Sequence, residues 1–300
     1  MIPASNPGAT ERETSEERGR PDLALIVLTH DEEPHLARCL ESVGDLASAI
    51  YVVDSGSCDR TLDIARRFTD HVAIHPFTNQ AEQFNWALDT LPCDAEWVLR
   101  LDADEVLLPP LRDEIARVLP TVPEHVTGLA MKRRMVFQGR WIRHGGIYPM
   151  WLLRLFRYGH GRAEELEMDE HIVLLDGEAQ RLEHDFADWN LKDLDFWTRK
   201  HIRYAAREAR VLERHAVSGR IDTSGLPAGD SSLRYKRRLK GSVYARSPLF
   251  LRALAYFLYR YVIRGGYRDG TEGLIYHVLQ AFWYRFYADV KVWEGTRQSS

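Results

Sequence analysis

The sequence predicts an α/β domain with a mostly parallel central sheet flanked by helices, followed by a helical extension. Short apolar runs of strand length alternate with amphipathic segments of helical period as far as Glu105. This alternation is typical of right-handed β-α-β units, in which parallel strands are buried on both faces. From about Leu191 the apolar positions recur at helical spacing only. We therefore expect a tail (1–21), a catalytic domain (22–189) and a helical region (190–300).

The composition is that of a folded protein with an unstructured start. Hydrophobic residues make up 45% and charged residues 28% of the chain. Residues 1–21 are polar and contain no apolar run of the kind found in a signal peptide. Cys39, Cys58 and Cys93 are scattered and form no CxxC pair, which argues against a disulfide framework or a zinc knuckle and favours a reducing, cytoplasmic setting.

Four apolar runs predict the parallel strands, and three intervening segments with apolar residues on one side predict the helices. The expected strands are 23–28, 50–53, 72–74 and 97–101. Polar clusters follow three of these strands, at residues 29–32, 54–59 and 102–105. Because ligands bind at the carboxyl ends of strands in such sheets, we expect these clusters to form one site.

The segment after the first strand has no glycine, which excludes the glycine-rich pyrophosphate turn of a Rossmann dehydrogenase. Asp102 and Asp104, separated by one small residue, can instead hold a divalent cation that neutralises a phosphate group. The alternative is that these acids only cap the helix expected after Pro109 and Pro110.

The pattern becomes mixed after this helix, because strands expected at 128–137 and 151–156 have no long helix between them. The connecting loop, 138–149, holds aromatic, basic and glycine residues and suits either an acceptor or phosphate pocket or an ordinary surface loop. Asp169 or Glu170 can act as a base if it faces the metal, and His184 can be a metal ligand. Each of these three is also common as a structural residue.

Seven stretches together resemble glycosyltransferase family 2, the inverting GT-A transferases, and especially the branch that builds bacterial lipopolysaccharide core and exopolysaccharide. In family order they are LIVLTHDEEPHLARCLESV, IYVVDSGSCDRTLDIA, QAEQFNWAL, WVLRLDADE, GRWIRHGGIYPMWLLRLFR, MDEHIVLLDG and LEHDF. The resemblance extends from about Leu23 to the C-terminus, and VVDSGSCDRT followed by LDADE is its most specific part.

The resemblance implies a GT-A (nucleotide-diphospho-sugar transferase) fold, Mg²⁺ or Mn²⁺ as cofactor, a UDP-sugar as the expected donor, and a glycan or lipid-linked acceptor. The residues that it implies for nucleotide binding are Thr29, Glu32, Asp54, Ser55, Gln83 and Asp102. For the metal it implies Asp102, Asp104 and His184, and for the catalytic base Glu170, with Asp169 one position away as the alternative. The chain departs from the family at His30-Asp31, where Asn-Glu is commoner.

The segment from Leu233 to Arg268 contains many arginines and lysines and no acid. Its apolar run, 249–263, is shorter than the roughly 20 residues that a bilayer span requires. Apolar and aromatic residues flanked by cations predict a helix in the interface of an anionic membrane, and hence a peripheral protein on the inner face of the cytoplasmic membrane. Packing of this helix on the catalytic domain or on a second copy is the alternative; no nucleic-acid module accompanies it.

We therefore predict an inverting glycosyltransferase of cell-surface polysaccharide or lipopolysaccharide synthesis. The alternatives are a Mg²⁺-dependent nucleotidyltransferase or phosphotransferase, and a catalytically silent nucleotide-sugar-binding membrane scaffold. A phosphatase of the haloacid dehalogenase type would carry its Asp-x-Asp on the first strand, whereas here the triplet ends the fourth.

Overall fold

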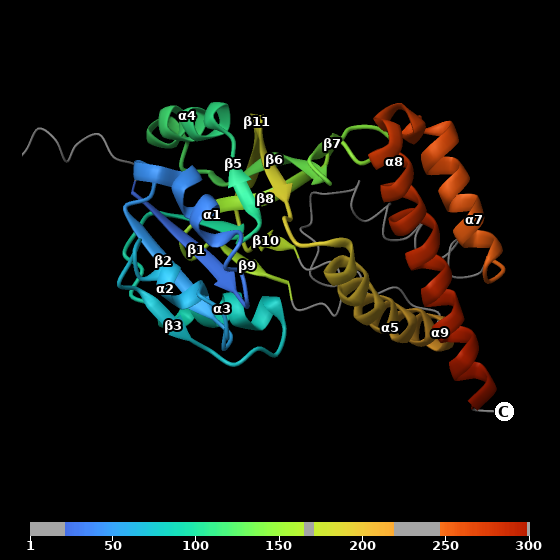
Figure 1. Ribbon diagram of the computed structural model, residues 1–300. Coiled ribbons are helices and arrows are strands. Elements are labelled where there is room, and N and C mark those ends of the chain that lie inside the picture. Colours follow the sequence, from blue (N-terminus) through green and yellow to red (C-terminus); the bar gives the residue numbers. More distant parts are fainter. Residues whose placement is uncertain (1–21, 165–170, 219–246, 299–300) are drawn as a thin grey trace, which may run out of the picture.

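The computed structural model describes residues 22–164, 171–218 and 247–298. An α/β unit runs from β1 to β11, and helices α5 to α9 follow beside it (Figure 1). The predicted tail, Asp169, Glu170 and the basic residues between 234 and 246 lie outside the described residues.

The central sheet has nine strands in the order β3-β2-β1-β4-β8-β6-β11-β5, with β7 paired to β6. The first four strands are β1 (Leu23–Thr29), β2 (Ala49–Asp54), β3 (Val72–Ile74) and β4 (Trp97–Asp102). The others are β5 (Glu105–Leu107), β6 (Val126–Phe137), β7 (Arg140–Ile142), β8 (Trp151–Arg157) and β11 (Glu178–Trp189). A separate antiparallel pair joins β9 (Gly161–Ala163) to β10 (Ile172–Leu174).

Most of these strands share one direction. β1 pairs in parallel with β2 and β4, and β2 with β3. β8 runs antiparallel between β4 and β6, so β6 and its parallel partner β11 again run with β4. The predicted mostly parallel sheet is confirmed.

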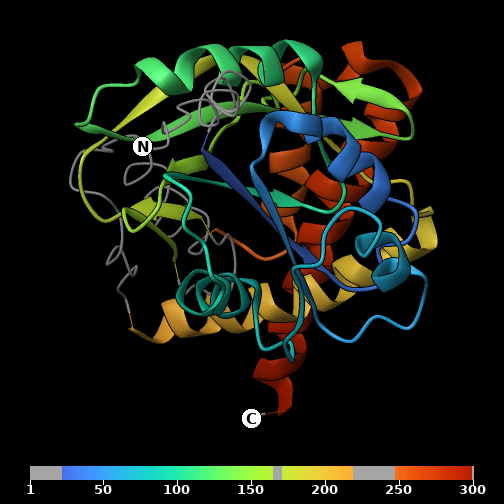
Figure 2. The same cartoon turned by 90° about the vertical axis from the view of Figure 1, so that its left-hand side faces the viewer.

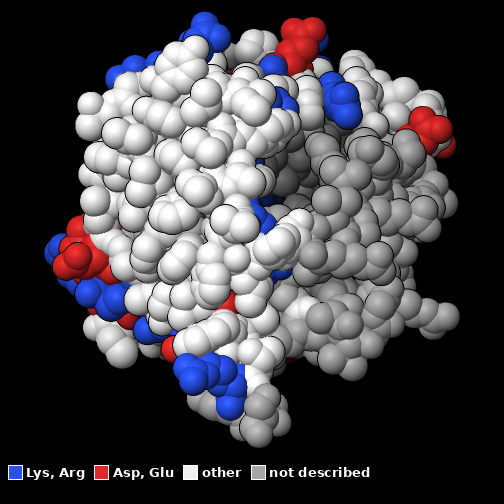
Figure 3. All heavy atoms as spheres, turned by 90° about the vertical axis from the view of Figure 1, so that its right-hand side faces the viewer, with Lys and Arg blue, Asp and Glu red and all other residues white. Residues whose placement is uncertain are grey.

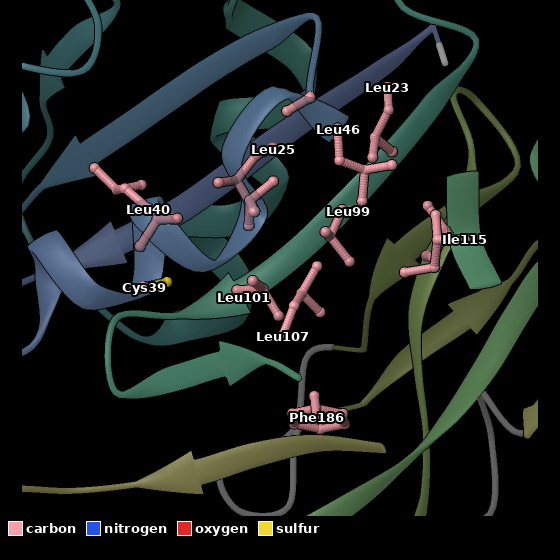
Figure 4. Close-up of a cluster of buried hydrophobic side chains, with 14 of the residues drawn as sticks. Leu23, Leu25, Cys39, Leu40, Leu46, Leu99, Leu101, Leu107, Ile115 and Phe186 are labelled. Atoms are coloured by element: carbon pink, nitrogen blue, oxygen red, sulfur yellow. The ribbon is translucent and has the colours of Figure 1, made fainter. Parts of the chain in front are cut away.

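Helices cover both faces of the sheet. Alternate residues of β1 point to opposite faces and belong to two separate buried apolar clusters, one under each layer of helices. α1 (Leu36–Val43), α2 (Thr61–Ala65) and α4 (Pro109–Val118) pack on the face formed by Leu25, Leu99 and Phe186 (Figure 4). α3 (Gln80–Thr90) packs on the opposite face, and α4 and α3 lie on opposite sides of the sheet in Figures 1 and 2.

The C-terminal region is helical, as predicted. It contains α5 (Leu194–Ser218), α7 (Leu251–Leu258), α8 (Gly270–His277) and α9 (Tyr284–Gln298). Two π-helical turns, Tyr259–Ile263 and Val278–Trp283, continue α7 and join α8 to α9. None of the helices within the described ranges has the length and apolar character needed to span a membrane.

Two contacts hold these helices together. Arg252 of α7 donates to the buried carboxylate of Asp289 in α9, with Nε 2.7 Å from Oδ1. Arg285 of α9 donates to Glu208 of α5 over 2.8 Å. A cluster of Phe137, Ile142, Ile147 and Tyr276 packs α8 against the β6–β7 hairpin, so the helical region is packed on the sheet.

One element differs from the sequence expectation. Residues 102–105 were expected to form a polar cluster after the fourth strand, but β5 starts at Glu105 and pairs antiparallel with β11. Glu105 is consequently buried, with 2% of its surface exposed. A three-residue strand is too short for its period to be visible in a sequence.

Glu114 of α4 supplies hydrogen-bond acceptors to backbone amides in an irregular part of β11. The β6–β11 register shifts between Arg181 and Asp185, which leaves backbone amides out of the ladder. Glu114 accepts hydrogen bonds from the backbone amides of Glu183 and His184, at 2.8 and 2.9 Å, and its Oε2 lies 2.9 Å from Nδ1 of His184. Burial raises the pKa of Glu114, but these hydrogen bonds outweigh it, so the pKa lies below its ordinary value.

This hydrogen bonding predicts a pH-dependent stability. A carboxyl group whose pKa is lower in the folded state stabilises above its unfolded pKa, and the contribution is lost as the pH falls through the folded pKa. We expect Glu114→Gln to lower the free energy of unfolding by about 1–2 kcal/mol at pH 7. The difference should shrink as the pH falls below the ordinary glutamate pKa of 4.5. Urea unfolding at several pH values measures the difference, with Glu178→Gln, at an exposed position of β11, as control. A loss of stability that does not depend on pH contradicts the assignment.

Candidate active site

Residues at the carboxyl ends of three adjacent strands come together at one edge of the sheet. Thr29 of β1 pairs with Asp54 of β2, and Leu28 pairs with Asp102 of β4. Because neighbouring strands are about 4.8 Å apart, these ends lie within roughly 10 Å of one another. The three polar clusters expected to share an edge do share it.

Asp54 is fully buried, and both of its carboxylate oxygens are used within the chain. Oδ1 accepts from the backbone amides of Gly56 and Ser57, at 2.9 and 2.8 Å. Oδ2 accepts from the hydroxyls of Thr29 and Ser57, at 2.8 and 2.5 Å. Gly56 has φ +91°, which favours glycine. Asp54 therefore fixes the shape of the loop after β2, and Ser55, whose hydroxyl donates to the Thr29 carbonyl over 3.1 Å, is part of that loop.

The loops after β1 and β2 are also bonded to each other. The backbone amide of Asp31 donates to the Ser57 hydroxyl, and the Asp31 carboxylate accepts from the Cys58 amide, both over 2.8 Å. The amide of Glu32 donates to the Thr61 hydroxyl over 2.8 Å. The two loops thus form one preorganised unit in which Asp31, the point of departure from the family pattern, adopts a φ of +52°.

Glu32 links this unit to the segment that follows β11. One of its oxygens accepts from the Lys192 ammonium over 3.0 Å, and the other lies 2.5 Å from Nδ1 of the buried His35. Nε2 of His35 accepts from the backbone amide of residue 191 over 2.8 Å. Asn190, in the same segment, donates to the Asp104 carboxylate over 2.9 Å. The segment after β11, which is distant in sequence, is therefore bonded to the edge of the sheet at Glu32 and Asp104.

Arg154 of β8 neutralises the acids at the end of β4. Its guanidinium lies 3.0 Å from Asp102 and 2.5 Å from Glu105. The β6–β8 register skips Arg154 between Leu153 and Leu155, which is a bulge that redirects the arginine toward these acids. Burial raises the pKa of Asp102, but Arg154 and Arg100 outweigh it and lower the pKa to about 2. Asp102 is therefore fully ionised at neutral pH.

Lys200 of α5 adds a cation from the helical region. Burial lowers its pKa, but Tyr204 and the carboxylates of Asp104, Asp188 and Asp102 raise it above the ordinary lysine value. Arg133 lies 3.2 Å from Asp188. Asp102, Asp104, Glu105 and Asp188 share this corner with Arg100, Arg133, Arg154 and Lys200. Burial raises the pKa of Glu105 to about 8; Arg154 opposes this shift, whereas Asp102 and Asp188 add to it.

The donor atoms at this corner fit a hard divalent cation. Asp102 and Asp104 offer carboxylate oxygens, the ligands that Mg²⁺ prefers, and Mg²⁺ commonly takes one or two carboxylates together with substrate phosphates. Within the described ranges no group of three or more His, Cys, Asp or Glu could hold a metal. The remaining ligands of such a cation would therefore come from the substrate and from water.

The structure does not bring two of the expected residues to this corner. His184 lies four residues before Asp188, roughly 13 Å along β11, where it contacts Glu114. Gln83 is buried in α3, where its amide donates to the His75 carbonyl over 3.3 Å and supports the His75 ring stacked on Trp86. The expected bases Asp169 and Glu170 follow β9 and lie outside the described residues.

Four residues at the site were not expected from the sequence: Arg154, Asn190, Lys192 and Lys200. Arg154 gave a signal, because a cation inside the apolar run WLLRLF needs a buried partner. Asn190 and Lys192 are polar residues directly after a strand, as are the other site residues. Lys200 gave no signal, because a lysine on an amphipathic helix is ordinarily exposed.

The family model for glycosyl transferase family 2 matches residues 24–169. The lipopolysaccharide core biosynthesis glycosyltransferase LpsC of Rhizobium meliloti is 24% identical over 277 residues, which cover 91% of this chain and 92% of that protein. An uncharacterised glycosyltransferase of Rickettsia typhi is 34% identical over 93 residues, 31% of each chain. This match thus spans about a third of the Rickettsia protein.

Solved structures with detectable similarity include TarS (residues 1–349) of Staphylococcus aureus, with a TM-score of 0.39 and 15% identity over 93% of this chain and 92% of that one. Glucosyl-3-phosphoglycerate synthase of Mycobacterium tuberculosis, in complex with Mg²⁺ and UDP, gives a TM-score of 0.31 and 21% identity over 40% and 45% of the two chains.

The matched residues contain β1 to β4 with the three polar ends that form the site, and the sheet has the predicted mostly parallel order. The predicted family is confirmed, and so is the predicted α/β fold with a mostly parallel central sheet and a helical C-terminal region. Residues 24–169 of the chain form a glycosyl transferase family 2 domain.

Proposed function

We propose that this chain transfers a sugar from a nucleoside diphosphate donor, a UDP-sugar by family expectation, to a glycan or lipid-linked acceptor with inversion at the anomeric carbon. One observation carries the proposal. In a family 2 domain, the loops that Asp54 holds in shape lie at the same edge of the sheet as Asp102 and Asp104. Similarity to LpsC over nine-tenths of both chains supports a role in lipopolysaccharide or related cell-surface polysaccharide synthesis.

The loops after β1 and β2 are proposed to bind the nucleotide. Their hydrogen bonds to Asp54, Thr29 and Ser57 are satisfied internally, so the loops need little reordering when a ligand enters. Glu32 and Lys192 hold the facing segment in place. We assign Asp54 to shaping this surface, because its oxygens are already used by the chain.

Asp102 and Asp104 are proposed to hold Mg²⁺ or Mn²⁺, which supplies positive charge that stabilises the departing diphosphate. A bound diphosphate would add negative charge beside the ionised Asp102, so binding there favours an added cation. Lys200 lies beside the same carboxylates and adds a fixed positive charge.

The acceptor hydroxyl must lose its proton as its oxygen forms the new bond to the anomeric carbon and the bond to the diphosphate breaks. We propose that Glu170, or Asp169 beside it, takes this proton. A base on the side of the sugar opposite the diphosphate is what an inverting displacement requires.

The helical region is proposed to lie against an anionic membrane. The exposed apolar residues of α7 and its π-helical extension recur at helical spacing: Leu251, Leu254, Leu258, Val262 and Ile263. Ile263 is 74% exposed and Leu251 64%. Arg264 and Arg268 are exposed beside this stripe. Figure 3 shows, on the side of the molecule that faces the viewer, a broad uncharged area of described atoms with Lys, Arg, Asp and Glu at its margins.

The metal assignment predicts the effect of one substitution. We expect Asp104→Ala to lower the slow, Mn²⁺-dependent release of UDP from a UDP-sugar by at least about 100-fold, since several kcal/mol of leaving-group stabilisation are lost. Chelation of the metal should have the same effect on the unaltered protein. Asp113→Ala, on α4 and exposed, is the control. Metal-dependent release that survives in Asp104→Ala would show the assignment to be wrong.

The base assignment predicts a split between binding and transfer. Glu170→Gln should bind UDP with Mn²⁺ as the unaltered chain does, because the amide keeps the size of the side chain. Transfer to the acceptor should fall by about 10²–10⁴-fold, the usual contribution of a general base. A thermal-shift titration and a transfer assay measure the two quantities. If Glu170→Gln transfers the sugar at the normal rate, the role of base is reassigned to Asp169, and Asp169→Asn tests that assignment.

The membrane assignment predicts reduced binding to vesicles. Leu258→Ser with Ile263→Ser should weaken flotation with phosphatidylglycerol vesicles by at least about tenfold, because two exposed apolar side chains no longer enter the interface. The control is Ile74→Ser with Leu175→Ser, two apolar residues of similar exposure on the α/β unit. Equal binding by both double variants would contradict a membrane-facing α7.

A further inference from the structure

Cations and aromatic rings alternate on one part of the sheet, which we name the cationic-aromatic cluster. It consists of Lys132, Arg134, Trp141, Tyr148, Trp151 and Arg181, from β6, β7, β8, β11 and the β7–β8 loop. The Lys132 ammonium lies 5.6 Å from the Trp151 ring centre, and Arg181 lies 5.0 Å from the same ring. Arg134 lies 4.2 Å from the Trp141 ring, which packs edge-on against Tyr148.

The cluster is on the same face of the sheet as the Asp102 carboxylate. Met131 belongs to the core under α1 and α4, so its neighbour Lys132 points to the other face. On β4, Leu101 belongs to that same core, and Asp102 follows it on the other face. Lys132 pairs with Trp151 of β8, the strand next to β4. The strand that carries Lys132, β6, and the strand that carries Asp102, β4, are therefore two strand spacings apart, which is roughly 10 Å.

A buried carboxylate holds the cations of the cluster in place. Asp185, of which 4% is exposed, lies 2.6 Å from Arg134 and 3.4 Å from Lys132. It also accepts from the Tyr148 hydroxyl over 3.0 Å. Because these groups are fixed by Asp185 and by the rings, they lose little freedom when a ligand binds.

The cluster keeps an excess of positive charge after this pairing. Among the described residues, the ion pairs of Lys132 and Arg134 are made with a single carboxylate, Asp185, and Arg181 packs on Trp151. Arg143 adds a further exposed cation 4.4 Å from Trp141. Arg134 is 37% exposed, Arg181 is exposed, and the three rings are half-buried. Rings that present part of a face attract the C–H groups of a sugar, and exposed cations attract carboxylate or phosphate. An uncharged acceptor would not require these cations.

We propose that the cationic-aromatic cluster is the acceptor site and that the acceptor is an anionic sugar, carrying a carboxylate or phosphate, which stacks on Trp151 and pairs with Lys132 and Arg181. The inference rests on the proposed transferase function, because the cluster adjoins the corner assigned to the donor diphosphate. It names the chemical class of an acceptor that the family leaves open.

Saturation-transfer NMR on the full chain with UDP and Mn²⁺ tests the proposal. The probes are trigalacturonic acid for carboxylates and glucose 6-phosphate for phosphate, with maltotriose and glucose as uncharged matches. We expect at least one anionic probe to bind at least about tenfold more tightly than its match, and Lys132→Gln with Arg181→Gln to remove that preference. Arg112→Gln with Arg117→Gln, on α4 across the sheet, removes the same charge and should leave the preference intact.

Three results overturn the proposal: anionic and uncharged probes that bind alike, a preference that survives in Lys132→Gln with Arg181→Gln, or a preference lost equally in the α4 control. UDP is titrated into the same proteins, which separates the two hypotheses. If UDP binds but neither anionic probe does, the acceptor inference fails alone. If an anionic probe binds through Lys132 and Arg181 but UDP does not bind, the anion site stands and the proposed donor chemistry fails.

Discussion

The ion pairs that Arg154 makes with Asp102 and Glu105 are the constraint on which the site depends. Two carboxylates this close would repel each other and raise each other's pKa, and burial would raise it further. The bulge in β8 brings one guanidinium to both acids. Glu105 in turn accepts from the backbone amide of Asp102 over 3.0 Å, which fixes the tight connection between β4 and β5. An ionised Asp102 at the sheet edge is possible because this arginine is buried beside it.

The helical region is part of the site and not an appendage. Lys200 of α5 lies close enough to Asp104 and Asp188 for its pKa to be raised, and Asn190 and Lys192 reach Asp104 and Glu32 from the segment between β11 and α5. The family match ends at residue 169, before any of these residues. The part of the chain that follows the match therefore contributes residues to the sheet edge that the matched part forms.

The sequence was sufficient for the parallel strands and for the edge where their polar ends meet, because apolar runs and β-α-β alternation are local patterns. It was not sufficient for partners made by long-range pairing. Nothing near Glu105 indicates that β5 buries it against β11, and nothing near His184 indicates that a register shift directs its ring toward Glu114. The family resemblance implied a contact between Asp54 and the nucleotide, whereas the structure shows both of its carboxylate oxygens bonded within the chain.

The same distinction applies to the basic segment near the C-terminus, where the sequence indicated a membrane-facing helix of apolar and aromatic residues flanked by cations. Arg252 is buried against Asp289, and Arg260 is half-buried beside the Tyr256 hydroxyl, so neither is an exposed membrane-facing cation. The exposed positions of α7 are aliphatic instead. Attraction between exposed charges weakens with salt, whereas burial of apolar surface does not. Within the described residues, the membrane contact proposed for this helix therefore depends mainly on its leucines, valine and isoleucine, with Arg264 and Arg268 contributing at its end.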